Sequence, residues 1–244
     1  MVGKNNYKIV GLAVLVLLCW MGYSPLACEG VVVWSDDFND GNYIGWTINE
    51  NPALGTGANW SAANLYLEFN QSGYGVISHP SSVVNGTWSF DVKPHASSFT
   101  QVVFISNNVT ELADINDWVG YWINFAASAD NIILSLRAKN GGPFTTVASY
   151  ETPIPIAGWH HIEVTRDTAG VFSVKHNGSL IMGGVSTEIN TSVMFAVYAE
   201  NSQAIDNIVV DDQFPSSIDW VLIIEIAVLA VAIIVVLVIV LKRK

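Results

Sequence analysis

Oxygen-bearing side chains cluster in one short stretch near the start of the chain. The sequence Asp-Phe-Asn-Asp-Gly at 37–41 places Asp37 and Asn39 two residues apart, ahead of a glycine. Carboxylate and amide oxygens are ligands that Ca²⁺ takes in proteins, whereas the same residues also bond their own backbone in ordinary turns. The stretch predicts a structural calcium bound by Asp37, Asn39 and Asp206, provided that the first and last strands of the domain pair.

Aromatic and amide side chains form a second cluster, at positions 116–124. Small-molecule sites combine aromatic side chains with a few polar groups that fix orientation, and sugar-binding sandwiches stack such rings on pyranoses. Successive residues of a strand face opposite ways, so one of Tyr121 and Trp122 is expected in the core. The competing interpretation is that most of these rings are core. The predicted ligand-binding residues are Trp118, Tyr121, Trp122 and Asn124.

Catalytic patterns are weak in this sequence. Glu111 and Asp114 are three residues apart, so on a strand they would face opposite ways and could not flank one glycosidic bond. His160 and His161 are adjacent and face opposite ways for the same reason. The sequence contains no nucleophile elbow, zinc-protease motif or phosphate-binding loop. It therefore predicts a protein that is not an enzyme.

Asparagine sequons are frequent in the middle of the chain. An Asn-x-Ser/Thr sequon marks a potential N-glycosylation site on the surface of an exported protein. An Asn- and Ser-rich chain also produces sequons by chance. Six occur here, and they predict a glycosylated surface at Asn59, Asn70, Asn85, Asn108, Asn177 and Asn190.

The elements that position these residues are expected to be β-strands. Short runs with apolar and polar alternation recur between Gly-, Pro- and Asn-rich turns, which is typical of an all-β sandwich. No helical period stands out before Trp220. The predicted strands are 31–35, 65–69, 88–93, 101–105, 119–125, 132–137, 144–150, 159–166, 171–176, 193–199 and 205–210.

The most regular stretch runs from Trp159 to Met182. Ile162 and Val164 alternate with polar residues, Phe172 and Val174 do the same, and Leu180 with Met182 is expected to continue the apolar face. Asn177-Gly178 is a type I′ hairpin signal. The stretch resembles laminin-G-like, concanavalin A-like jelly-roll domains, in which a Trp-His-His strand leads into a strand, an Asn-Gly turn and a return strand.

Both ends of the middle region carry the same resemblance. Positions 36–41 with Gly45-Trp46 resemble the opening of many jelly-roll carbohydrate-binding modules, and 204–210 resemble their closing strand. The resemblance implies that these two strands lie side by side. It indicates the fold and not the function, because this sandwich carries lectins, adhesins, hydrolases and spacers.

The charge of the middle region excludes one class of partner. From Glu29 to Asp219 five basic and twenty acidic residues give a net charge of −15. Such a surface repels phosphate backbones, so nucleic acid is not expected as a partner. An acidic surface also suits divalent cations.

The apolar N-terminal end predicts export. Residues 1–27 have the parts of a signal peptide: Lys4 and Lys8, an apolar run, then small residues. Lipidation of Cys28 is an alternative, although Pro25 occupies the place of the aliphatic residue of a lipobox. A third option is an uncleaved anchor. If the first residues are removed, Cys19 goes with them, and no internal disulfide remains.

The apolar C-terminal end predicts membrane anchoring. Residues 220–241 are long enough to cross a bilayer as one helix, and the basic residues 242–244 mark the cytoplasmic side. Residues 28–214 are then the jelly-roll ectodomain, and 215–219 are a short linker. The expected location is the plasma membrane, with a single pass and the ectodomain outside the cell.

These features together predict a surface-anchored, non-catalytic module. Its partner would be a carbohydrate or a surface glycoprotein, and the bilayer would hold residues 220–241. The alternatives are a structural, surface-layer-like envelope glycoprotein and a glycoside hydrolase with an unrecognised site. Two carboxylates about 5–10 Å apart on the binding face would favour the hydrolase.

Overall fold

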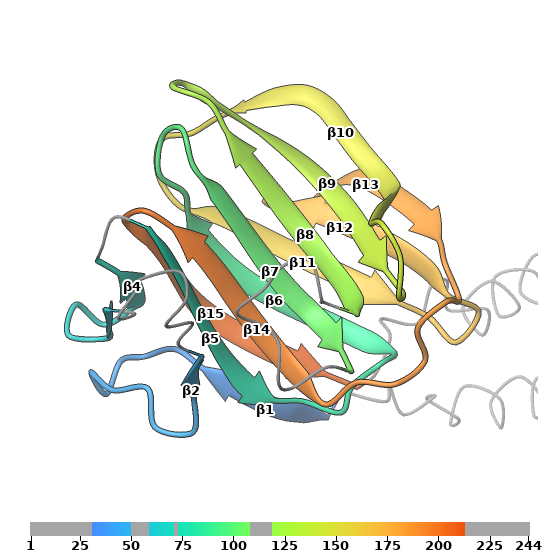
Figure 1. Cartoon of the computed structure of the whole chain (residues 1–244), viewed down its shortest axis with the longest axis horizontal. Coiled ribbons are helices and arrows are strands. Elements are labelled where there is room, and N and C mark those ends of the chain that lie inside the picture. The colour runs from blue at the N-terminus through green and yellow to red at the C-terminus, as the bar shows by residue number, and fades with distance from the viewer. Residues whose placement is uncertain (1–30, 50–58, 71–72, 108–118, 213–244) are drawn as a thin grey trace, which may run out of the picture. The chain divides into compact units, whose positions relative to one another are not determined.

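The computed structural model describes residues 31–49, 59–70, 73–107 and 119–212, which form two antiparallel sheets stacked face to face (Figure 1). The eight-stranded sheet contains, in spatial order, β13 (Ser179–Val185), β12 (Val171–His176), β11 (His160–Arg166), β6 (Gly86–Lys93), β15 (Gln203–Asp211), β4 (Leu67–Phe69) and β3 (Trp60–Ser61), with β1 (Val32–Asp36) also on β15. The seven-stranded sheet contains β10 (Thr145–Pro155), β9 (Asn131–Lys139), β8 (Gly120–Ala127), β7 (Phe99–Ser106), β14 (Met194–Glu200), β5 (Tyr74–Pro80) and β2 (Thr47–Asn49). The all-β, jelly-roll-like sandwich expected from the sequence is confirmed.

The first and last strands lie side by side, as the resemblance implies. Trp34 pairs with Val210, and Asp36 pairs with Ile208. Val32 pairs with Asp211, so the first and last described residues lie at the same end of the sandwich. Glu200 and Gln203, joined by a short turn, lie at the opposite end, because β15 runs from Gln203 to Asp211.

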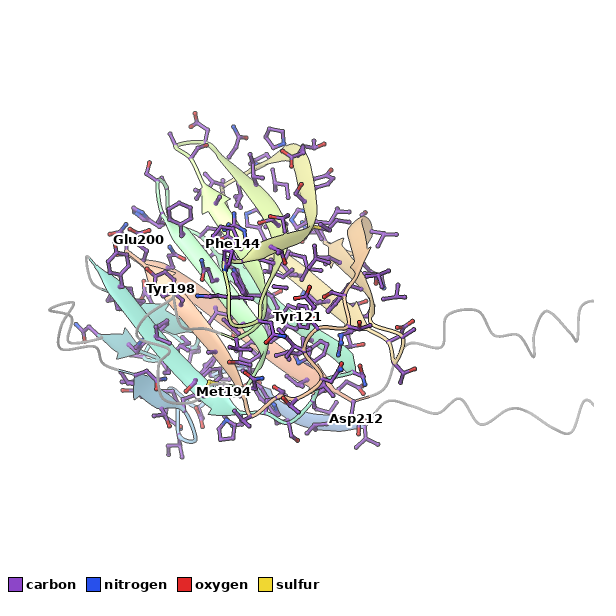
Figure 2. All side chains as sticks on the ribbon, turned by 45° about the vertical axis from the view of Figure 1, so that its right-hand side comes forward. Tyr121, Phe144, Met194, Tyr198, Glu200 and Asp212 are labelled. Atoms are coloured by element: carbon purple, nitrogen blue, oxygen red, sulfur yellow. The ribbon has the colours of Figure 1, made fainter. Side chains whose placement is uncertain are left out.

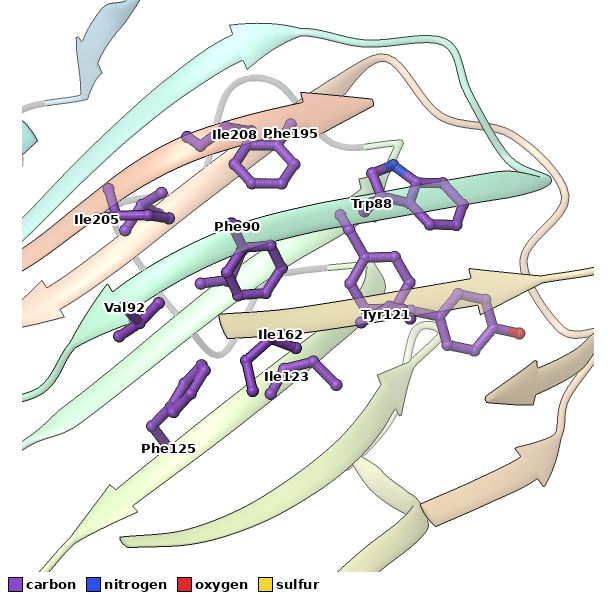
Figure 3. Close-up of a cluster of buried hydrophobic side chains, with 14 of the residues drawn as sticks. Trp88, Phe90, Val92, Tyr121, Ile123, Phe125, Ile162, Phe195, Ile205 and Ile208 are labelled. Carbon is purple, nitrogen blue, oxygen red and sulfur yellow. The ribbon is translucent and has the colours of Figure 1, made fainter. Parts of the chain in front are cut away.

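The core fills the space between the two sheets (Figure 3). Trp88 and Phe90 of β6 face Tyr121, Ile123 and Phe125 of β8, and all five side chains are fully buried. Alternation along each strand directs these residues inward, while the intervening residues face away from the core. Ile162, Val164, Phe172 and Val174 belong to this core, as their alternation predicts.

The hairpin between β12 and β13 has the predicted turn, but the side chain of Leu180 does not face the way that was predicted. Asn177 and Gly178 both have positive φ, 47° and 80°, as a type I′ turn requires. The register then shifts, so that Lys175 pairs with Leu180 while Val174 pairs with Met182. This bulge turns Leu180 outward, where it is 68% exposed. The expectation that Leu180 continues the apolar face is therefore wrong.

Strand β5 was not expected from the sequence. Four consecutive residues of this strand are buried, so it shows no alternation between buried and exposed positions. Position 75 of this strand requires glycine, because the Phe69 ring packs against its Cα. A Cβ added to Gly75 would lie only 2.3 Å from Phe69 Cε2. The short strands β2 and β3 were also missed. Their two or three residues are too few for a periodic pattern.

The predicted segments 1–27, 215–219, 220–241 and 242–244 lie outside the described residues. Within the described residues, no helix has the length and apolar character needed to cross a membrane. The signal peptide, the linker, the membrane helix and the ectodomain boundaries stay predictions.

Candidate ligand-binding face

The predicted calcium ligands lie where β1 and β15 meet. Asp37 follows β1 directly and is exposed, and its Oδ1 accepts a hydrogen bond of 3.1 Å from the backbone nitrogen of Asn39. Bonding from Asn39 lowers the pKa of Asp37. Burial raises the pKa of Asp206, and the charges of Asp91, Asp37 and Asp36 raise it further. Asp36 pairs with Ile208, which places Asp37 and Asp206 at the same end of the β1–β15 pair. The loop also makes the capped turn that was the alternative interpretation.

The structure gives limited support for a metal at this place. Within the described ranges, no three His, Cys, Asp or Glu side chains are placed to hold one metal ion. A calcium ion here would need amide and carbonyl oxygens in addition to the carboxylates. The calcium site stays a prediction.

We expect calcium to raise the melting temperature of a soluble segment, Glu29–Ser217, and Asp37→Ala to abolish the increase. Binding to the folded form alone stabilises by about 2.7 kcal/mol at a hundredfold excess over Kd. Thermal unfolding with calcium and with chelator measures the effect. Equal melting temperatures of the unchanged segment with calcium and with chelator would contradict the calcium site. Residues 37–41 would then be an ordinary turn.

The seven-stranded sheet carries a second buried cluster on the face that points away from the core. No described strand forms a third layer over this face. Its apolar centre crosses four strands and consists of Val76, Val103, Trp122, Met194, Ala196 and Tyr198. We call this side of the sheet the outer face.

Aromatic rings follow the outer face from one end to the other. Tyr74 stacks on Tyr198, with ring centroids 5.7 Å apart, and Trp122 meets Phe144 edge to face at 6.4 Å. Tyr74 is 39% exposed and Phe99 is 50% exposed, so both offer free ring surface. Figure 2 shows Met194, Tyr198 and Glu200 spaced along β14, with Phe144 further across the sheet.

A polar row crosses the same face at the level of Tyr198. Strand register places Tyr198 beside Gln101, Gln101 beside Asn124, and Asn124 beside Ser135. Gln101 Nε2 donates to Asn124 Oδ1 at 3.2 Å. Asn124 Nδ2 is buried and has no hydrogen-bond partner in the described part of the chain. A buried donor without a partner costs about 1–3 kcal/mol, and such groups in native structures call for a specific explanation, such as a functional role.

The predicted ligand-binding residues divide between the two faces of β8. Trp122 and Asn124 lie together on the outer face, almost fully buried. Tyr121 points into the core, where its hydroxyl lies 2.8 Å from Ser186 Oγ and accepts from the Ile189 backbone at 3.3 Å. Trp118 lies outside the described residues. Alternation predicted that Tyr121 and Trp122 separate, and the structure shows which one is core.

Sequence reasoning missed most of the other aromatic residues of the outer face and the cation beside Trp122. Tyr74 and Tyr198 lie on strands whose consecutive residues are buried on both faces, so no alternation marks them. Arg137 and Phe144 belong to predicted strands, but nothing in their spacing ties them to Trp122. The available signal was the pairing of β8 with β9, which places Arg137 directly beside Trp122.

The adjacent histidines are structural and face opposite ways, as expected. His160 is buried, and its Nδ1 lies 3.1 Å from Nε2 of His176. On the other side of the sheet, His161 Nδ1 lies 2.7 Å from Asp91 Oδ1. A hydrogen bond between two imidazoles needs one ring nitrogen without a proton. The His160–His176 pair therefore requires at least one neutral ring.

We expect the domain to lose stability as the pH falls below about 6.5, the usual value for histidine. Burial lowers the pKa values of His160, His176 and His79. The unfolded chain therefore binds more protons in this range, so the stabilisation is complete above the unfolded pKa and is lost as the pH falls through the folded values. Urea unfolding at several pH values measures the slope.

In a His176→Gln variant the free energy of unfolding should depend less steeply on pH. His95→Gln changes an exposed ring and should leave this pH dependence as it is in the unchanged domain. The same free energy of unfolding at pH 5 and pH 7.5 in the unchanged domain would contradict this account of the three histidines.

Five of the predicted glycosylation sites are described, and they differ in accessibility. Asn59, Asn70, Asn177 and Asn190 are exposed, and Asn85 is half-buried, whereas Asn108 lies outside the described residues. Asn85 and Asn190 both accept hydrogen bonds from the buried guanidinium of Arg166. Their occupancy stays a prediction.

The same architecture occurs in solved structures of sugar-related proteins. A carbohydrate-binding module, CBM66 from Bacillus subtilis, has a TM-score of 0.53 at 16% identity, over 67% of this chain and 93% of the module. The carbohydrate recognition domain of Emp47p has a TM-score of 0.59 at 12% identity, over 78% of this chain and all of that domain. A Bacillus licheniformis β-glucanase has a TM-score of 0.54 at 12% identity, over 76% of this chain and all of the glucanase.

These likenesses show the fold alone. Their identities are low, and the three proteins include both binding domains and a hydrolase, so the fold by itself does not separate these functions. No protein-family model matches the chain, and no curated protein matches it in sequence. The chain has a jelly-roll-like sandwich fold, and its function has to be argued from the outer face.

Proposed function

We propose that the protein is a glycan-binding module and that the outer face of the seven-stranded sheet is its binding site. The observation that carries the proposal is the combination on one face of exposed rings, Tyr74 and Phe99, with the polar row of Gln101 and Asn124. Aromatic rings supply contact area at low cost in side-chain entropy. Within the row Gln101 is the less buried amide, at 9% exposure against 1% for Asn124, and amides bond hydroxyl groups. The fold likeness to a carbohydrate-binding module and a recognition domain supports the same class.

The carboxylates of the face favour binding over hydrolysis. Glycosidases of the common type use two carboxyl groups that flank the bond. The outer face carries Glu200 on β14, whose Oε2 accepts from the Phe99 backbone at 3.2 Å, and the edge strand β10 carries Glu151, which accepts from Ser149. Strands β7, β8 and β9 lie between them, so at about 4.8 Å per strand they are roughly 19 Å apart and too distant to flank one bond. Glu111 and Asp114, the stretch weighed for catalysis, lie outside the described residues. We therefore propose a module without catalytic activity.

The position of the rings within the sandwich suits display at a cell surface. Tyr74 and Phe99 lie near Glu200, at the end of the sandwich opposite to Asp211. If residues 220–241 cross the membrane, the chain leaves the domain at the Asp211 end, which is opposite to the end that carries the rings. A protease that removes a C-terminal tag from intact cells would contradict this orientation.

A glycan array on segment Glu29–Ser217 tests the proposed function. Retention of at least one glycan is expected, and Tyr74→Ala should weaken it about tenfold, which corresponds to about 1.4 kcal/mol. Trp159→Ala is the matched control, because Trp159 is also 39% exposed but lies beside the other sheet. No retention of any glycan would favour the envelope-component alternative. Release of shortened products would favour the hydrolase.

A further inference from the structure

Arg137 is a half-buried cation on β9, beside the apolar centre of the outer face. It pairs in register with Trp122, and its Cζ lies 4.6 Å from the centroid of the Phe144 ring. Its Nε donates to Ser135 Oγ at 3.1 Å. The stacked ring and this bond fix the plane of the guanidinium, so its two terminal nitrogens are held in one direction. Burial lowers the pKa of Arg137, but a guanidinium stays protonated at neutral pH.

The charge of Arg137 has no carboxylate partner among the described residues. The ion pairs there join His161 to Asp91 and Lys175 to Glu163, both on the other sheet. Arg166, the structural arginine of this domain, donates through its terminal nitrogens to four protein acceptors, whereas among the described residues Arg137 donates only through Nε, to Ser135. Partly buried charges are ordinarily paired, so an unpaired one on a binding face points to a ligand.

The terminal nitrogens of this half-buried guanidinium are the donors that a ligand on this face can reach. Asn124 adjoins Ser135, the residue that bonds Arg137, but its Nδ2 is buried beneath the surface. A guanidinium whose terminal nitrogens have no acceptor in the described part of the chain suits a ligand group that only accepts hydrogen bonds. A guanidinium fork binds carboxylate and phosphate-like oxygens in pairs, with bonds about twice as strong as neutral ones. An exposed ring for stacking lies next to the fork in Phe144, which is 53% exposed.

We propose that Arg137 binds an anionic group of the glycan, so that the site takes acidic sugars such as uronic acids or sulfated sugars in preference to neutral ones. The inference rests on the proposed glycan-binding function and specifies its ligand class. An anionic ligand is compatible with the acidic domain, because charges more than about 10 Å away are largely screened at 0.1 M salt. Arg137 then determines specificity, while the rings supply contact area.

The test uses the full chain, purified in a detergent without a sugar head group, and oligogalacturonate as the probe. The same oligosaccharide after methyl esterification is the neutral match, since it keeps the rings and removes the charge. The unchanged protein should bind the acid at least tenfold more tightly than the ester, and added salt should reduce the difference. A sulfated galactan oligosaccharide forms a third arm, and binding there instead would identify sulfate as the preferred anion.

Substitution locates the preference. Arg137→Gln should bring the affinities for acid and ester within about twofold of each other, and Arg137→Lys should give an intermediate ratio, because lysine keeps the charge without the fork. Lys93→Gln is the matched control, since it removes the same charge from an exposed position on β6 of the other sheet. It should keep the original ratio.

Different failures have different meanings. Equal binding of oligogalacturonate, its ester and the sulfated probe by the unchanged protein would overturn the acidic-glycan inference and leave the proposed function intact. A tenfold preference that survives Arg137→Gln would also overturn the role of Arg137. Failure of every probe and of the whole array would reject the proposed function, and the inference would fall with it.

Discussion

Truncation of Phe172 to alanine is expected to lower the free energy of unfolding by about 3–5 kcal/mol, as for other buried aromatic side chains. Phe172 is 1% exposed at the centre of the core. Its ring lies 4.9 Å from that of Tyr121 and 6.2 Å from that of Phe104, measured between centroids. Removal of the ring would leave a cavity between the two sheets. Urea unfolding of the soluble segment measures the loss.

The neighbouring residue provides the control for this variant. Val171 is adjacent on β12 but 44% exposed, so Val171→Ala should change the free energy of unfolding by about 0.5 kcal/mol or less. An unchanged unfolding midpoint for Phe172→Ala would mean that the register of β11, β12 and β13 is wrong.

Replacement of Arg166 by methionine is expected to cost about 3 kcal/mol or more, because buried acceptors left without donors each lose about 1–3 kcal/mol. Arg166 is 2% exposed. Nη1 donates to Val84 O at 2.8 Å, and Nη2 donates to Ser186 O at 3.3 Å. The guanidinium also donates to Asn85 and Asn190, so this single side chain joins the end of β11 to two loops, the one before β6 and the one before β14.

Two further variants, Arg166→Lys and Lys175→Met, distinguish the loss of the Arg166 hydrogen bonds from the loss of a positive charge. Lysine at 166 keeps the charge but cannot reach four acceptors, so an intermediate loss is expected. Lys175 pairs with Glu163 at 2.6 Å on a half-exposed surface, where an ion pair contributes about 0–1 kcal/mol. A loss of less than 1 kcal/mol for Arg166→Met would contradict the bridging role. Arg166 also lies 5.4 Å from the Phe172 ring, so the two large effects should not be additive.

The sequence predicted the elements with one buried face. Strand Val171–His176 has its predicted bounds, and its alternation identified Phe172 and Val174 as core. This was possible because its other face is polar and half-exposed, which leaves a visible period of two. The closing strand was predicted for the same reason, and its pairing with the first strand followed from the jelly-roll resemblance.

The binding face was only partly predictable, because its strands are buried on both sides. In β14 all six residues from Met194 to Ala199 are buried, so the pattern does not separate Phe195, which faces the core, from Tyr198, which faces outward. Tyr121 and Trp122 posed the same problem on β8. The neighbours of Trp122 depend on the order of the strands in the sheet. This order could not be predicted, because strands far apart in the sequence, such as β7 and β14, are paired.

The most direct test of the account is a map of which sheet contacts the glycan. Segment Glu29–Ser217, labelled with ¹⁵N, can be titrated with each glycan retained on the array while amide shifts are recorded. We predict that the shifts gather on β5, β14, β7, β8 and β9, with the side-chain amides of Gln101 and Asn124 among the largest changes. Shifts confined to the eight-stranded sheet, around His161 and Asp91, would contradict the assignment of the outer face as the binding site.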